Sequence, residues 1–171
     1  MRYLFLIVLF LGVSLAPRST NAQNRELAKL ELLQEKLKTA IEDTNKVKLL
    51  QSISYQYKFM NPEQGVAYGE QSLELANKLN WKKGQAKSYN SLGGNLFAMG
   101  DFDKSLEYFN KALKLNKSEN NKSEMAKNYS NIGNIYYNLS QIYEAEFGPL
   151  TGELPDKSGL HKVPTKVVDV K

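Results

Sequence analysis

Few residues in this chain have the types and spacing that catalysis requires. The one histidine, His161, stands in a chain without cysteine, so neither a His-based metal site nor a nucleophilic triad can be assembled around it. The acidic pair Asp101 and Asp103 suits the start of a helix, where negative charge is favoured. Glu31 and Glu35 suit the solvated face of a helix better than an acid/base pair. The sequence therefore predicts no enzyme activity, no metal ligand and no cofactor.

Phosphate and nucleic-acid binding are also disfavoured. Gly93-Gly94 lies inside a helical pattern and lacks the following glycine and lysine of a phosphate-binding loop. The chain has 23 Lys and Arg against 18 Asp and Glu, a formal net charge of +5, and the basic residues are spread along its length. We therefore expect no nucleic acid among its partners.

The N-terminal residues have the layout of a signal peptide. The apolar run from Tyr3 to Ala16 is shorter than the roughly 20 residues that span a bilayer, and small residues follow it before Gln23. We predict that residues 1–22 are a signal peptide cleaved near Ala22-Gln23, so that the mature protein is periplasmic or extracellular. An uncleaved segment acting as a membrane anchor is the alternative, and it is the only membrane contact that we expect.

The chain after this leader has the pattern of a series of amphipathic helices, because apolar residues recur at steps of three and four. A turn around residues 82–84 and a polar stretch over residues 116–123 are expected between helices. No segment before Glu146 alternates with the period of a strand, so the fold class is all-α. The expected helices cover residues 24–41, 44–60, 62–79, 86–99, 102–115 and 125–139.

Local signals mark three of the helix starts. Asp43 is a good N-cap, and Asn61 followed by Pro62 combines a cap with a proline at the first helical position. Gly100 can end one helix while Asp101 caps the next. These residues predict the starts of the second, third and fifth helices.

The helices come in pairs that repeat at offsets of 39 and 40 residues. In the second helices, Gly65, Ser105 and Ala145 correspond at steps of 40, and Leu73-Glu74-Leu75 matches Leu113-Lys114-Leu115. In the first helices the matches are Leu50, Tyr89 and Tyr129; Ile53, Leu92 and Ile132; Ser54, Gly93 and Gly133; and Tyr57, Leu96 and Tyr136.

Such a repeat has a physical reason, because one helix hairpin cannot bury its apolar stripe without neighbouring hairpins. We expect Gly93 and Gly133 to permit close approach of helices. Tyr68, Tyr108 and Phe109 are expected to pack in the interior and not to bind ligands.

These residues resemble the tetratricopeptide repeat, whose pattern has an aromatic, Leu-Gly and Tyr in the first helix and a small, an aromatic and a small residue in the second. The best copy departs from the pattern at Leu96, where the family has Tyr, and lacks the closing Pro. That copy contains Tyr89, Leu92-Gly93, Gly100-Asp101-Phe102, Ser105, Phe109 and Ala112-Leu113.

The resemblance implies a right-handed α-solenoid of antiparallel helix pairs that binds a protein or peptide partner. Its repeats would cover about residues 46–81, 86–119 and 126–145, the last one incomplete, within a domain over 24–145. The period exceeds the usual 34 residues and is similar to the longer repeats of exported sensor regions in Bacteroidota-type bacteria.

In the family, the first helices of successive pairs line the groove that binds peptides. The resemblance places the corresponding positions here in the fourth and sixth expected helices. Lys127, Asn131 and Asn134 match part of the family's clamp for a C-terminal carboxylate, whereas Asn90 and Gly94 do not. A polar groove without a dedicated ligand is the alternative. The groove-facing positions are Lys87, Asn90, Ser91, Gly94, Phe97, Lys127, Ser130, Asn131, Asn134 and Tyr137.

The third repeat is predicted to stop within its second helix. Residues 146–171 contain three of the five prolines and read as an irregular or disordered tail. An array that ends in this way exposes an apolar face. The chain is then a fragment or frame-altered end of a longer protein, or the tail covers the face, or the face docks on a partner.

The sequence thus predicts an exported interaction scaffold without catalysis. The alternative is the N-terminal sensory part of a longer signalling protein, such as a histidine kinase, a cyclase or a transcriptional regulator, since similar repeats precede such regions.

Overall fold

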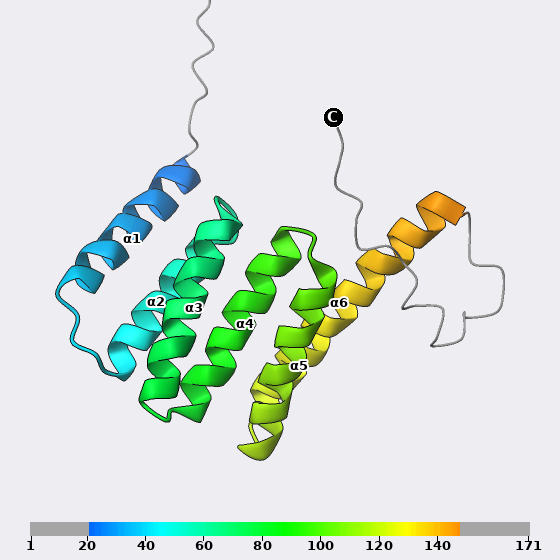
Figure 1. The fold of residues 1–171 in the computed structure, drawn as a ribbon. Coiled ribbons are helices and arrows are strands. Elements are labelled where there is room, and N and C mark those ends of the chain that lie inside the picture. The colour runs from blue at the N-terminus through cyan, green and yellow to red at the C-terminus, as the bar shows by residue number, and fades with distance from the viewer. Residues whose placement is uncertain (1–20, 148–171) are drawn as a thin grey trace, which may run out of the picture.

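A computed structural model describes residues 21–147 of the chain as an array of helices (Figure 1). Each helix packs against the next one along the chain, and α2 also contacts α4. No strand is present between residues 21 and 147. The helices are α1 (Asn21–Lys38), α2 (Thr44–Tyr57), α3 (Pro62–Lys78), α4 (Lys82–Ala98), α5 (Phe102–Ser118) and α6 (Lys122–Phe147). The prediction of an all-α helical-repeat solenoid is confirmed.

Three helices begin at the predicted caps. The Asp43 carboxylate accepts hydrogen bonds from the backbone amides of Asn45 at 2.8 Å and Lys46 at 3.0 Å. The Lys46 amide is the main reason that the pKa of Asp43 is lowered. Asn61 and Asp101 cap α3 and α5 in the same way. These starts were predictable because a cap depends on residues within a single turn.

Two turns lie elsewhere than predicted. The chain turns at Asn80, with φ of 51°, so α4 begins at Lys82 and not near Ala86. A second left-handed residue, Asn120 with φ of 52°, separates α5 from α6 inside the stretch that was expected to be wholly non-helical. Asparagine tolerates this conformation better than other residues with a side chain, apart from aspartate. In both turns asparagine occupies the left-handed position, and asparagine predicts such a turn less strongly than glycine does.

The prediction that the sixth helix ends near Leu139 is wrong, because α6 continues to Phe147. At an offset of 40, Ser140 replaces Gly100 at the left-handed position and Gln141 replaces the capping Asp101. Ala145 therefore lies in α6 and not in a second helix. Residues 146 and 147 are helical, and the rest of the predicted tail lies outside the described residues.

The first helix is also displaced, since α1 covers Asn21–Lys38 and not 24–41. The predicted cleavage point Ala22-Gln23 falls in its first turn, and the remainder of the leader lies outside the described residues. Within residues 21–147, no helix has the length and apolarity needed to cross a membrane. Export therefore stays a prediction.

Paired helices meet through a serine and a glycine. In the first pair, Ser54 of α2 donates its hydroxyl to the Gly65 carbonyl of α3 at 2.7 Å. In the second pair the two residue types exchange places, and Ser105 of α5 donates to the Gly93 carbonyl of α4, also at 2.7 Å. The Phe109 ring lies about 3.0 Å from where a Cβ of Gly93 would be. Close approach at Gly93 is thus confirmed.

Gly133 does not have this role. Nothing within residues 21–147 lies within 4 Å of a Cβ placed on it, so the prediction of close helix approach there is wrong. The aromatic predictions hold, since Phe109 is 3% exposed and Tyr68 stacks on Tyr57 at 5.5 Å. Tyr108 packs on Tyr89 with ring centroids 5.9 Å apart. Phe109 is therefore an interior residue, whereas Tyr68 and Tyr108 are half-buried and pack against other tyrosines.

We expect Gly65→Ala to destabilise the protein. The new Cβ would lie 1.8 Å from Oδ1 of Asn95, and Nδ2 of that buried side chain is held at 3.1 Å by Ser54 Oγ. Overpacking of this kind costs about 1–3 kcal/mol. Gly94→Ala is the matched control, because its nearest neighbour is the flexible Lys58 Cδ at 3.7 Å. Urea denaturation followed by circular dichroism compares them, and equal loss in both variants would contradict the packing argument.

Candidate functional site

A groove of about 540 Å³ runs across the first helices of the array. Most of its lining comes from α2, α4 and α6, and α1 and α5 contribute one residue each, Lys29 and Phe109. Because α2 contacts α4 directly, the groove is a continuous surface over successive pairs. This placement on first helices is the one that the family resemblance implies.

Six of the ten predicted groove residues lie in the groove lining. Four others lie outside it: Phe97, Ser130, Asn134 and Tyr137. Phe97 packs edge-on against Phe102 at 5.5 Å, and Tyr137 is 65% exposed. Of the three residues that match the carboxylate clamp, Asn134 therefore does not line the groove. The residues in the lining are Lys87, Asn90, Ser91, Gly94, Lys127 and Asn131.

The contribution of α2 to the groove was not predicted, because the first repeat matches the family pattern poorly. The repeat offset of 39 residues could have identified the groove residues of α2. Applied to the five groove positions predicted on α4, this offset leads to five residues of the first repeat, all in the groove lining. They are Lys48, Gln51, Ser52, Tyr55 and Lys58.

The groove is positively charged. Five lysines contribute to its lining, and Glu124 is the one acidic residue among them. Glu124 is already paired with Lys127, whose Nζ lies 2.8 Å from its Oε1. Within residues 21–147, no carboxylate pairs with Lys48, Lys58 or Lys87. These three ammonium groups give the groove a local excess of positive charge.

Buried amides hold the first helices together beneath the groove. Gln51 of α2 donates to the Gly84 carbonyl at 3.0 Å and to Ser88 Oγ at 3.1 Å, both on α4. In the opposite direction, Asn95 of α4 donates to Ser54 of α2. Amides buried in this way are stabilising only when they are paired. The α2–α4 spacing is therefore fixed by specific polar contacts as well as by apolar packing.

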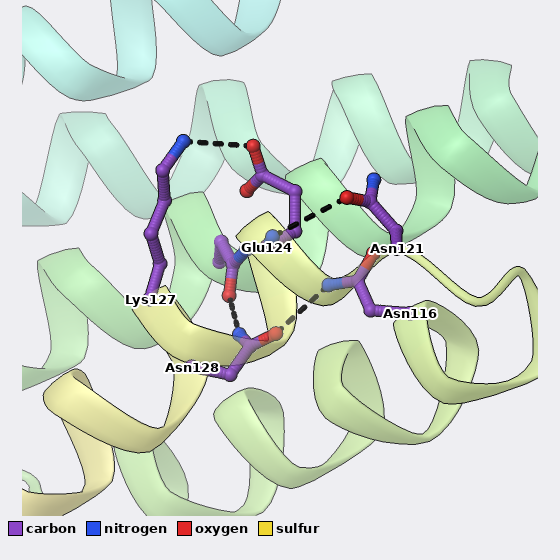
Figure 2. A network of polar contacts seen from close by, with 6 residues as sticks. Asn116, Asn121, Glu124, Lys127 and Asn128 are labelled. Atoms are coloured by element: carbon purple, nitrogen blue, oxygen red, sulfur yellow. Dashed lines mark hydrogen bonds and ion pairs between the residues drawn. The ribbon is translucent and has the colours of Figure 1, made fainter.

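A similar network fixes α6 (Figure 2). Asn128, which is fully buried, accepts a hydrogen bond from Asn116 of α5 at 2.8 Å and donates to Asn90 of α4. Asn121 accepts from the Glu124 backbone amide at 3.3 Å, next to the Glu124–Lys127 ion pair. The Asn90 oxygen is thus occupied by the protein itself. This side chain sets the position of α6 and leaves less capacity for a ligand.

Comparison with known proteins identifies the array. Residues 49–118 match the tetratricopeptide repeat family. Residues 49–118 are thus tetratricopeptide repeats. The match covers α3, α4 and α5 with most of α2, and so includes the two complete helix pairs.

A curated relative supports the same assignment. Tetratricopeptide repeat protein 29 of Trypanosoma brucei brucei is 28% identical over 92 residues, which are 53% of this chain and 19% of the relative. The chain thus spans about a fifth of the relative's length. Similarity to the exported Bacteroidota-type repeats stays a prediction.

Between residues 21 and 147, no group of three or more His, Cys, Asp or Glu side chains could hold a metal ion. His161 lies outside the described residues. The groove of the tetratricopeptide array is therefore the candidate site.

We expect Asn128→Ala to lower the free energy of unfolding by about 1–3 kcal/mol, because it leaves the buried Asn116 amide without its partner. Asn131→Ala is the matched control, since Asn131 is half-buried on the same helix and its side chain makes no hydrogen bond within residues 21–147. Urea denaturation compares the two variants. If they lose equal stability, the network does not hold α6 in place.

Proposed function

We propose that this protein is a non-catalytic interaction scaffold whose groove binds an acidic, extended segment of a protein partner. Tetratricopeptide repeats are generally scaffolds that bind proteins, and the match over residues 49–118 supports this class of function. The observation that carries the choice of an acidic segment is the set of three lysines, Lys48, Lys58 and Lys87, without carboxylate partners.

The other groups of the groove suit a peptide backbone. Ser91 and Asn131 are half-buried in the lining and carry side chains that can both donate and accept hydrogen bonds. Tyr55 is 58% exposed at the α2 side and offers an aromatic surface. Acidic side chains would approach the lysines while the main chain contacts these neutral groups. Electrostatic complementarity of this kind speeds association and selects the partner.

We expect reversal of groove charge to abolish selectivity for acidic peptides. Lys58→Glu combined with Lys87→Glu should weaken binding of a labelled Glu-rich peptide by about tenfold or more. Fluorescence polarisation at low and high salt measures this affinity, and salt should weaken binding to the unmodified protein.

Two controls make this result specific. Lys36→Glu with Lys83→Glu makes the same change in net charge at exposed positions outside the groove lining. A peptide with Gln in place of Glu tests the ligand side. Equal weakening by both charge reversals, or equal binding of the two peptides, would refute the groove as the binding site.

Export is part of the proposal, and the leader composition of residues 1–22 supports it. We expect the protein purified from a secreting host to begin at or near Gln23. N-terminal sequencing of that product decides the matter, and an N-terminus at Met1 in a soluble cytoplasmic fraction would exclude export. The alternative of a sensory part of a longer signalling protein stays a prediction.

A further inference from the structure

The last helix of the array has an outer face that no other helix between residues 21 and 147 covers. This outer face consists of Tyr129, Ile132, Gly133, Tyr136 and Ser140, which share one side of α6. Tyr129 is 51% exposed and Tyr136 is 46% exposed. α6 lies at the far end of the array (Figure 1). The outer face is therefore an apolar surface of several helical turns.

The equivalent face of α4 shows what such a surface contacts. At an offset of 40, Leu92 is 1% exposed and Leu96 is 6% exposed, in a helix that packs against both α3 and α5. The Phe109 ring of α5 lies against Gly93, about 3.0 Å from the position of a Cβ. Glycine at this position of the repeat thus provides a hollow for an aromatic ring. Gly133 provides the same hollow with open space above it.

The outer face also carries a ring that could fill the hollow. Tyr136 lies one turn after Gly133 on the same side of the helix. A two-fold axis between these two residues would place Tyr136 of each copy on Gly133 of the other. A face that holds both the ring and the hollow is self-complementary, which is the condition for an isologous dimer.

The charges favour the same arrangement. Residues 128–143 contain no Asp, Glu, Lys or Arg, although such residues make up 24% of the chain. Beside the first part of the outer face, Lys117 Nζ lies 5.6 Å from the Tyr129 ring centroid. Beyond its other end are Glu144 and Glu146. Antiparallel pairing brings Lys117 of one copy near Glu144 of the other, so opposite charges flank an uncharged centre.

We propose that the outer face of α6 binds the outer face of a second copy of this chain, with the two helices antiparallel. The second copy supplies a covering helix that residues 21–147 do not provide. The groove residues Lys127 and Asn131 lie on another side of α6, so each copy keeps its groove. The dimer does not depend on the proposed peptide binding, and it would present two grooves.

Filling the hollow tests the packing. We expect Gly133→Leu in the full-length chain to raise the dimer dissociation constant by about tenfold or more, because the new side chain excludes Tyr136 of the second copy. The monomer should keep its fold, since nothing within residues 21–147 lies within 4 Å of the new Cβ. Gln71→Leu, at an exposed position on α3, is the control and should leave dimerisation unchanged. Sedimentation velocity over a concentration series gives the constants, and circular dichroism checks the fold.

Exchanging charges tests the orientation. Lys117→Glu and Glu144→Lys should each weaken the dimer, and the double variant should restore it, because antiparallel pairing puts these residues opposite each other. Lys58→Glu with Lys87→Glu should still dimerise, which separates this proposal from peptide binding. A chain that stays monomeric at all concentrations, as it would if residues 148–171 covered the outer face, overturns the proposal. So does a dimer unaffected by Gly133→Leu, or one that the double charge exchange fails to restore.

Discussion

The contact between a serine hydroxyl and a glycine carbonyl is the point on which each complete helix pair depends. Ser54 with Gly65, and Ser105 with Gly93, bring the two backbones together through one hydrogen bond. In both pairs the serine satisfies a buried carbonyl. Each glycine also makes room for a side chain of a neighbouring helix, Asn95 of α4 at Gly65 and Phe109 of α5 at Gly93. The apolar side chains around each contact, among them Phe109, pack at a distance that this contact sets.

Once the pairs are set, buried amides determine how one pair sits on the next. Gln51, Asn95 and Asn128 each connect two or three helices, and their polar groups are turned inward. The base of the groove is thus occupied by internal hydrogen bonds, and the lysines above it supply the free charge. A base held by hydrogen bonds, with lysines above it, suits recognition by charge pattern better than recognition by one deep pocket.

The incomplete third repeat divides the surface of α6 into two regions of different character. One side continues the positive groove through Lys127 and Asn131. The other side presents Tyr129, Gly133 and Tyr136, which have the residue types of a buried interface but are exposed in the single chain. Because these sides are separate, an interaction at one need not block the other.

The sequence by itself determined the helix starts at Asp43, Asn61 and Asp101, the helical-repeat fold and most groove positions on α4. Caps depend on residues within one turn, and a repeat shows itself by comparing the chain with itself. The tertiary structure decided that Gly93 is covered while Gly133 is open, and that Asn90 holds α6. A glycine or an asparagine has the same local preference in both settings, and what packs opposite it depends on residues far away in the chain.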